Sequence, residues 1–335
     1  MTDTIRVGIY GASGYAGQNL VELLSKHPHV TLIFATSNTY SGQKVAGTDL
    51  SYVPSADVNL DDVELVFLAL PHKASAPIAK VALDAGKRVI DLSADFRFDN
   101  VSDYEAWYDI KHPHPEMLSL APYGLPEIHR KQIVDKQIVG VPGCYPTATL
   151  LGLYPLLSVD ALSADAPIIV DAKSGVSGAG RSANETTHFI NAYGNIIPYK
   201  AGYNHRHVGE IEQEIKRFMP SLGQLIFTPH IVPVDRGLMA SIYVTLNSTI
   251  TSDKVHSLYT TVYADEPLIN VLPLGQQASF KTIQRANTAE ISITPIGENY
   301  VHITSTIDNL RKGASSQAIQ CFNLMMGFTE TEGLI

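Results

Sequence analysis

The chain has two cysteines, and the setting of one of them suits a nucleophile. Cys144 stands in the stretch VPGCYPT, directly after Pro142 and Gly143 and at the start of a predicted helix. The partial positive charge and free N–H groups of a helix start stabilise a thiolate and can hold an oxyanion. Cys321 falls on the apolar side of the last predicted helix, where a cysteine acts as a small buried hydrophobe. We therefore predict that Cys144 is catalytic and that Cys321 is a packing residue.

A catalytic thiolate needs a proton partner, and the segment YNHRHVGEIEQEIKRF offers two imidazoles. His205 and His207 precede a predicted helix whose apolar residues Ile211 and Ile215 face inward. Close to Cys144, either imidazole could act as a general acid and base; elsewhere, each is a solvated residue at a helix end. The H-x-H spacing by itself is a weak metal signal without a third ligand, so no metal site is predicted.

The first glycine-rich turn has the composition of a dinucleotide site. In GIYGASGYAG, glycines recur at Gly11, Gly14 and Gly17, between a predicted strand and a predicted helix. The first permits a tight turn, the second lets a pyrophosphate approach the backbone, and the third lets the helix pack on the strand. The predicted phosphate-binding turn also includes three of the residues between these glycines, Ser13, Tyr15 and Ala16. The alternative is a glycine-rich turn without a ligand.

The segment after the second predicted strand, ATSNTYSGQK, contains no carboxylate. A site that prefers NAD usually offers an Asp or Glu there to the ribose 2′-hydroxyl. Ser37, Asn38 and Lys44 could instead donate to a 2′-phosphate, so the segment favours NADP.

A second glycine- and serine-rich segment, DAKSGVSGAGR at residues 171–181, begins at the end of a predicted strand and continues as a loop. Such a backbone can closely approach a cofactor or a phosphate. Ser177 is not the nucleophile of a hydrolase elbow, because Ala179 and not glycine lies two residues after it. The alternative is a flexible turn, which leaves unexplained why Lys173 and Arg181 bracket the loop.

The elements that must position these residues fall into two patterns. Apolar runs at 5–10, 30–36, 63–70 and 88–93 alternate with segments of helical period, which predicts a Rossmann-like, doubly wound parallel sheet. The second half has closely spaced strands, which predicts an α+β domain with a largely antiparallel sheet; they lie at 168–172, 225–234, 239–246, 289–297 and 300–307. The last helix is expected to pack on the first domain. We predict a dinucleotide-binding domain of residues 1–143 with 311–335, and a catalytic and oligomerisation domain of residues 144–310.

Composition excludes several classes of protein. The 335 residues are 45% hydrophobic and 17% charged, with a net charge of -9, which fits folded domains and opposes binding to nucleic acid. The chain shows no membrane-length apolar run and no targeting segment, and two cysteines cannot make a disulfide framework. We expect a cytoplasmic protein.

Nine segments together resemble the N-acetyl-gamma-glutamyl-phosphate reductase family, within the semialdehyde dehydrogenase superfamily. They are GASGYAG, FLALPHKAS, VIDLSADFR, APYGLPE, VPGCYPT, KSGVSGAGR, HRHVGEIEQ, FTPHIVPVDRG and IDNLRKGASSQAIQ. The resemblance implies NADPH-dependent reduction of an acyl phosphate in arginine biosynthesis, through a cysteine thioester, by a homodimer or homotetramer.

The resemblance also implies roles for individual residues. Cys144 is the nucleophile, His207 is the acid and base with His205 as the alternative, and Arg97 in DLSADFR binds the phosphate. Three residues approach the nicotinamide half of the cofactor: Ser177, Gly178 and Asn309. Because the substrate that the resemblance implies is anionic, further candidate cations for it are Lys173, Arg181, Arg206 and Arg236. Where family members often carry an arginine after the serine that follows strand two, this chain has Asn38, so Lys44 is the expected substitute.

Three other functions remain open on the sequence alone. The first is a related reductase that acts on aspartyl or aminoadipyl phosphate. The second is a noncatalytic dinucleotide sensor, which the presence of both Cys144 and the two histidines argues against. The third is a zinc hydrolase built on the H-x-H pairs, which is the weakest.

Overall fold

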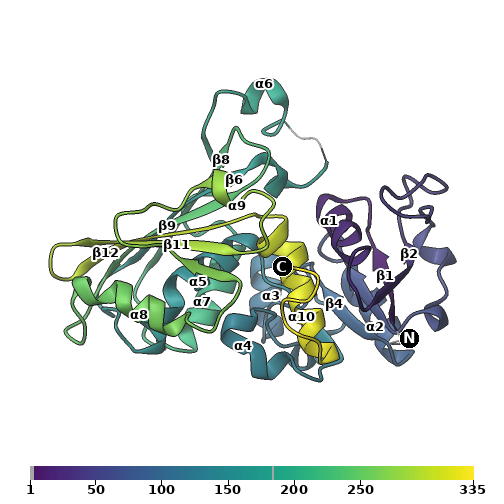
Figure 1. Ribbon diagram of the computed structural model, residues 1–335, viewed down its shortest axis with the longest axis horizontal. Coiled ribbons are helices and arrows are strands. Elements are labelled where there is room, and N and C mark those ends of the chain that lie inside the picture. The colour runs from purple at the N-terminus through teal and green to yellow at the C-terminus, as the bar shows by residue number, and fades with distance from the viewer. Residues whose placement is uncertain (1–3, 183–184) are drawn as a thin grey trace. The chain divides into compact units, whose positions relative to one another are not determined.

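The computed structural model describes residues 4–182 and 185–335. The chain forms two compact units. The first unit is Met1–Gly143 with Ala314–Ile335, and the second is Cys144–Gly313. Each is described by itself (Figure 1). Among the described residues, no helix is both long and apolar enough to cross a membrane.

The first unit contains a five-stranded sheet in the order β2-β1-β3-β4-β5, with every pair parallel. Its strands are β1 Ile5–Tyr10, β2 Val30–Ala35, β3 Leu65–Leu68, β4 Arg88–Asp91 and β5 Ile138–Gly140. The helices between them are α1 Tyr15–Leu24, α2 Ser75–Asp84, α3 Val101–Tyr108 and α4 Pro126–Ile133. The predicted doubly wound parallel sheet is confirmed.

Two buried carboxylates hold the loops that follow β3 and β4. Asp95 accepts the backbone N–H groups of Lys73 (2.8 Å), Ser75 (3.1 Å) and Ala76 (3.1 Å), and so caps the start of α2. Asp91 accepts the backbone N–H and the hydroxyl of Ser93. Burial, followed by the charge of Asp95, raises the pKa of Asp91 to about 7.

The C-terminal helix α10, Ser316–Met326, belongs to the first unit, as expected. Phe322 lies against Phe67 of β3, with ring centroids 5.9 Å apart. Cys321 is fully buried, and its Sγ donates to the carbonyl of Gly124 at 3.3 Å. The packing role predicted for Cys321 is confirmed.

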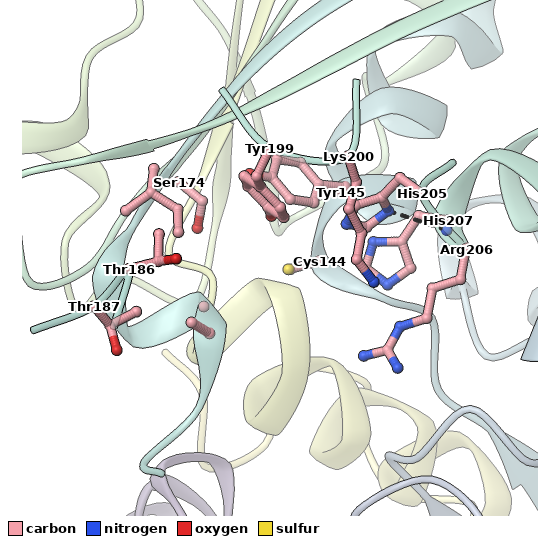
Figure 2. A pocket seen from close by; sticks show the side chains of 13 residues that line it. Cys144, Tyr145, Ser174, Thr186, Thr187, Tyr199, Lys200, His205, Arg206 and His207 are labelled. Atoms are coloured by element: carbon pink, nitrogen blue, oxygen red, sulfur yellow. Dashed lines mark hydrogen bonds between the residues drawn. The ribbon is translucent and has the colours of Figure 1, made fainter. Parts of the chain in front are cut away.

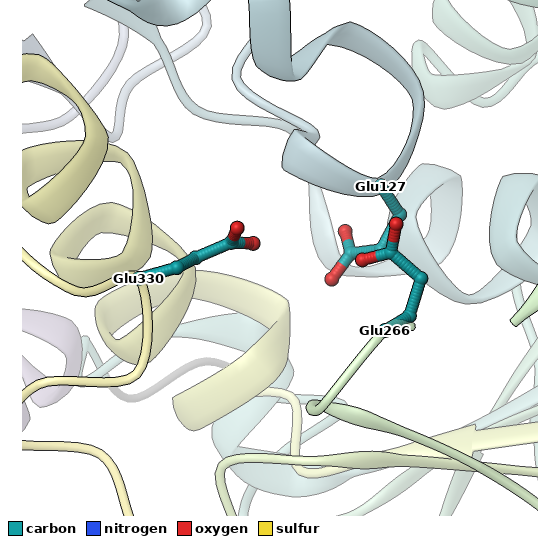
Figure 3. Close-up of side chains that lie close together, drawn as sticks. All are labelled: Glu127, Glu266 and Glu330. Atoms are coloured by element: carbon teal, nitrogen blue, oxygen red, sulfur yellow. The ribbon is translucent and has the colours of Figure 1, made fainter. Parts of the chain in front are cut away.

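A polar cluster fixes the chain after α10 within the first unit. Gln320 Nε2 donates to one carboxylate oxygen of Glu127 (2.9 Å) and one of Glu330 (2.7 Å). Arg130 pairs with Glu330 at 2.8 Å. Figure 3 shows the Glu127 and Glu330 carboxylates; Glu266, drawn in the same view, belongs to the second unit. Within the first unit, Gln320 thus binds both acids and Arg130 binds Glu330.

The second unit contains a seven-stranded sheet in the order β10-β11-β12-β9-β6-β8-β7. Its strands are β6 Ile168–Gly175, β7 Ile197–Pro198, β8 Leu225–Val232, β9 Leu238–Thr245, β10 Ile269–Val271, β11 Ala289–Ile296 and β12 Tyr300–Ile307. Only the pairs β6–β8 and β10–β11 are parallel, so the expectation of a largely antiparallel sheet is confirmed. Figure 1 shows α5 Cys144–Ser158, α7 His207–Lys216 and α8 Val255–Val262 on one side of this sheet.

Helix α5 is apolar almost all round and lies buried against β9 and β12. It continues through Pro155, which has no N–H to offer the carbonyl of Leu151. The hydroxyl of Tyr263 donates to that carbonyl at 2.6 Å, and the hydroxyl of Tyr259 donates to the carbonyl of Gly152. These two tyrosines stabilise the helix that carries Cys144 at its first position.

Candidate active site

Cys144 is the first residue of α5, is partly exposed, and lines a cavity of about 400 Å³ within the second unit. A cavity of this size suits a small metabolite. In Figure 2 the Cys144 sulfur lies in the space framed by Tyr199, Tyr145 and a pair of histidines. The lining residues are Cys144, Tyr145, Ser174, Gly178, Ala179, Thr186, Thr187, Tyr199, Lys200, His205, Arg206, His207 and Ile231.

The structure brings His205 and His207 to this cavity together with Cys144. Both histidines are buried, and their ring centroids are 4.7 Å apart. The backbone N–H of His207 donates to Nδ1 of His205 at 3.2 Å. Because Nδ1 of His205 accepts this bond, the neutral His205 ring carries its proton on Nε2.

Burial, together with the charges of Arg206 and Lys200, lowers the pKa of His205 to about 3. The ring is enclosed by Tyr145, Tyr199 and Phe227, with centroids 5.4 to 5.7 Å away. His205 is therefore a neutral hydrogen-bond donor at physiological pH.

Two cations line the cavity, and the sequence had indicated only one. Arg206, at the N-cap position of α7, was predicted to bind substrate. Lys200 was missed, because it follows a two-residue strand that the apolar pattern does not reveal. Its φ of 45° is unusual for a residue with a side chain, and such backbone strain is concentrated at functional sites. The cavity thus offers two positive charges beside Cys144.

Two buried tyrosines form a hydrogen-bonded chain in the same wall. The hydroxyl of Tyr199 donates to that of Tyr145 at 3.2 Å, and the hydroxyl of Tyr145 donates to the carbonyl of His230 at 3.3 Å. Burial raises the pKa of both tyrosines, so both remain protonated. Neither tyrosine was predicted, since a tyrosine gives no spacing signal.

Glu210 is an acid of α7 that does not line the cavity. It is fully buried and lies three residues after His207, on the same face of α7. A buried carboxylate in the first turn of a helix interacts favourably with the helix dipole.

The predicted nicotinamide residues lie together in the second unit. Nδ2 of Asn309 donates to the hydroxyl of Ser177 at 3.0 Å, and Oδ1 of Asn309 accepts the N–H of Gly237 at 2.8 Å. A β-carbon on Gly178 would lie 2.5 Å from the Ser174 hydroxyl. Gly178 therefore lets its loop pack on Ser174 and form part of the cavity wall.

The glycine turn of the first unit fits a dinucleotide. A β-carbon at Gly11 or Gly17 would collide with backbone, at Ala69 in the first case and at Gly11 and Ala12 in the second. At Gly14 a β-carbon would meet only the Gly11 carbonyl, at an ordinary 3.5 Å. The fold thus requires Gly11 and Gly17, whereas a bare Gly14 leaves open backbone at the start of α1, where a pyrophosphate binds. Ser13, Tyr15 and Ala16 lie in the same turn and the first turn of α1.

The residues predicted to recognise a 2′-phosphate lie in two places. The Ser37 hydroxyl accepts the Ser13 hydroxyl at 2.8 Å, so Ser37 stands beside the glycine turn. Lys44 lies in the following exposed loop, where its Nζ donates to the carbonyl of Asp49 at 3.0 Å.

Lys173 does not reach the cavity, contrary to the sequence prediction. Alternate residues of a strand face opposite sides of the sheet, and it is Ser174 of β6 that lines the cavity. Lys173 points to the other side, where its Nζ pairs with Asp171 at 2.5 Å. Lys173 therefore pairs with an acid on the face of the sheet opposite the one that Ser174 occupies.

Arg97 belongs to the first unit. Its guanidinium donates to the carbonyls of Leu92 (2.9 Å) and Val141 (2.8 Å), after β4 and β5. It is partly buried, in the loop held by Asp91 and Asp95. The side chain is thus fixed at the carboxyl edge of the parallel sheet, where ligands bind in doubly wound folds.

Comparison with known proteins finds a matching family profile for each of the two units. Residues 6–136 match the profile described as "Semialdehyde dehydrogenase, NAD binding domain", and residues 144–309 match "Semialdehyde dehydrogenase, dimerisation domain". The chain is 42% identical to the N-acetyl-gamma-glutamyl-phosphate reductase of Moorella thermoacetica and 41% identical to that of Clostridium beijerinckii. Each alignment covers 98% of both chains.

Solved structures of lower identity share the fold. Aspartate semialdehyde dehydrogenase II of Vibrio cholerae, complexed with ASA, superposes with a TM-score of 0.77 at 20% identity, over 97% of this chain and 99% of that one. The Candida albicans aspartate semialdehyde dehydrogenase with NADP gives 0.69 at 15% identity, over 96% and 100%.

Proposed function

We propose that this chain, which belongs to the family of N-acetyl-gamma-glutamyl-phosphate reductases, reduces N-acetyl-gamma-glutamyl phosphate to N-acetylglutamate 5-semialdehyde and phosphate in arginine biosynthesis, with NADPH as the reductant. The observation that carries this proposal is the cavity in which Cys144, two histidines and two cations meet. A thiol, an imidazole pair and positive charge are the groups that covalent reduction of an anionic acyl phosphate requires.

In the first half of the reaction, the thiolate of Cys144 attacks the acyl carbon. A carbon–sulfur bond forms, the carbon–oxygen bond to the phosphate breaks, and inorganic phosphate leaves with the bonding electron pair. Backbone N–H groups at the start of α5 stabilise the oxyanion that forms on the acyl carbonyl. Arg97 binds the phosphate. The product is a thioester on Cys144, which divides one difficult reduction into two easier steps.

In the second half, Cys144 is released and the aldehyde leaves. NADPH, when bound, supplies the hydride that reduces the thioester carbonyl. The turn with Gly11, Ser13, Gly14, Tyr15, Ala16 and Gly17 binds its phosphates, Ser37 and Lys44 bind the 2′-phosphate, and Ser177, Gly178 and Asn309 bind the nicotinamide half. His207 gives a proton to the sulfur as the carbon–sulfur bond breaks.

We assign the acid and base to His207 because His205 is held neutral. A ring with a pKa of about 3 does not carry a second proton at pH 7, so His205 cannot deliver one as an imidazolium. His205 instead offers its Nε2–H as a fixed donor and orients the start of α7 through its Nδ1.

The substrate is anionic, and the chain has a net charge of -9, so the attraction must be local. Arg206 and Lys200 line the cavity and bind the carboxylate end of the substrate. The enzyme acts in the cytoplasm as a homo-oligomer built on the domain at 144–309, whose profile description names dimerisation.

The reverse reaction tests the proposal most simply. We expect phosphate-dependent reduction of NADP with N-acetylglutamate semialdehyde, and at least 100-fold lower catalytic efficiency with aspartate semialdehyde or the aminoadipate analogue. Preference for either analogue would reassign the substrate, and equal efficiency with NAD would remove the NADP assignment. Iodoacetamide labelling of Cys144 no faster than that of free cysteine would favour the noncatalytic sensor.

A further inference from the structure

Asp308 and Arg236 form a buried ion pair of the second unit that has no part in the proposed reaction. Nη1 of Arg236 donates to Oδ2 of Asp308 at 3.3 Å, and both residues are buried. Arg236 was a candidate substrate cation in the sequence, but it is not among the residues that line the cavity. Because taking two charges out of water is costly, such a pair is a poor source of stability, and its contacts indicate what it holds in place instead.

The Asp308 carboxylate binds backbone with both of its oxygens. Oδ1 accepts the N–H groups of Leu310 (2.8 Å) and Arg311 (3.1 Å), and Oδ2 accepts the N–H of Arg285 (2.6 Å). Arg285 has a φ of 65°, a strained value for a residue with a side chain, and this bond holds it there. The carboxylate thus fixes the start of the turn that follows β12.

That turn lies behind the nucleophile. The backbone carbonyl of Asp308 accepts the N–H groups of Arg311 (3.1 Å) and Gly313 (3.0 Å). Gly313 packs on the catalytic cysteine so closely that a β-carbon at position 313 would lie 2.8 Å from Cβ of Cys144. The position of Asp308 therefore sets the backbone against which Cys144 rests.

The Arg236 end of the pair lies behind the predicted nicotinamide loop. The N–H of Gly175 donates to the carbonyl of Gly237 at 2.9 Å, and the N–H of Ser177 donates to the carbonyl of Asp235 at 3.1 Å. A β-carbon on Gly175 would lie 2.8 Å from the backbone N and Cα of Arg236. The loop that carries Ser177 thus rests on the backbone of Arg236 and its neighbours.

We propose that Asp308 and Arg236 are positioning residues whose ion pair sets the spacing between the sulfur of Cys144 and the loop that binds the nicotinamide half of NADPH. One partner holds the turn behind Cys144 and the other belongs to the segment behind Ser177, so the pair joins the two supports. The proposal rests on the proposed function. Hydride transfer needs both supports in register, whereas thioester formation needs only Cys144 and the substrate. Loss of the pair therefore slows the second half of the reaction and spares the first.

The test separates the two half-reactions in Asp308→Asn. Whichever way the new amide is turned, its NH₂ group faces two N–H donors that a carboxylate oxygen accepts in wild type. The matched control is Asp171→Asn, which removes the carboxylate of another ion pair of the second unit, that with Lys173.

Each half-reaction has its own signal in a single turnover. Phosphate released from N-acetyl-gamma-glutamyl phosphate without NADPH measures thioester formation, and oxidation of NADPH added to the thioester measures hydride transfer. We expect Asp308→Asn to slow hydride transfer by about 100-fold and phosphate release by less than about threefold. The control should change neither rate by more than about threefold.

Arg236→Lys tests the same pair without leaving the Asp308 carboxylate alone in the interior. An ammonium does not reproduce the planar geometry of the guanidinium, so this variant should slow hydride transfer at least 10-fold and spare phosphate release. Because the two residues act as a unit, the double variant should be no more than about threefold slower than Asp308→Asn.

Unchanged hydride transfer in both single variants, or an equal loss in the two half-reactions, would overturn the proposal. A measurement without substrate distinguishes this result from failure of the proposed function. Saturating NADPH should slow iodoacetamide labelling of Cys144 at least 10-fold in wild type but less than threefold in Asp308→Asn, and equal protection in both would also overturn the proposal. If wild type shows this protection but releases no phosphate from the acyl phosphate, the positioning pair stands and the proposed function fails.

Discussion

The α-carbon of Gly313 packs directly on the side chain of Cys144. A β-carbon at position 313 would lie 2.8 Å from Cβ of Cys144, closer than unbonded carbon atoms approach. Gly313 lies in a π-helical turn, Arg311–Ser315, and such turns are frequent at functional sites. The backbone behind the nucleophile is therefore as much a part of the site as the side chains in front of it.

We predict that Gly313→Ala lowers kcat by about 100-fold, because a 1 Å displacement of a reacting atom has an effect of that order. Cofactor affinity, measured by fluorescence titration, should stay within about threefold of wild type, since Gly313 lies outside the glycine turn. An unchanged kcat would show that the position of Cys144 tolerates this displacement. A loss of cofactor binding would point to general misfolding instead.

His205 gives a prediction about protonation. Its pKa in the folded chain, about 3, lies below the value near 6.5 expected in the unfolded chain. Between these two pH values only the unfolded state takes up the proton, so the contribution of His205 to stability is complete above pH 6.5 and is lost as the pH falls towards 3. Nitrogen NMR of the imidazoles should show His205 as the Nε2–H tautomer, without titration from pH 5 to 8. Titration of His205 near pH 6.5 would reopen its assignment as the acid and base.

Asp91 gives a prediction of opposite sign. Its pKa of about 7 in the folded chain lies above the unfolded value near 4, so the folded state holds a proton that the unfolded state has lost between these pH values. The contribution of Asp91 to stability is present below pH 4 and is lost as the pH rises to 7. In urea unfolding, the free energy of unfolding of Asp91→Asn minus that of wild type should rise by about 2 kcal/mol from pH 5 to pH 8. A difference that does not change with pH would mean that Asp91 is ionised throughout.

Much of the fold was predictable because its signals are local. Near-continuous apolar runs such as VELVFLAL indicate strands covered on both faces, and β3 is buried at every position. The short strands β5, β7 and β10 have two or three residues and carry no such pattern. The π-helical turn at Gly313 was also unpredictable, since a closely packed glycine looks like any other in sequence.

The part of the candidate site that was predictable consists of reactive residue types that are rare in the sequence. One cysteine at a helix start and an H-x-H pair are unusual, and the structure brings both to one cavity. Lys173 was misplaced because its position on β6 depends on strand parity, which a loop motif does not reveal. Lys200 was missed because a single charged residue is common on any surface, and only its place in the cavity wall and its backbone conformation distinguish it.

The most direct test of the proposed chemistry is to trap the acyl group on Cys144. The purified protein is mixed with N-acetyl-gamma-glutamyl phosphate without NADPH, quenched in acid, digested and analysed by mass spectrometry. We predict that the peptide carrying Cys144 gains the mass of one N-acetylglutamyl group and that adding NADPH before the quench removes it. Cys144→Ser should bind cofactor normally, gain no thioester and lose turnover by several orders of magnitude. Full turnover by Cys144→Ser, or acylation at a residue other than Cys144, would contradict covalent catalysis by this thiol.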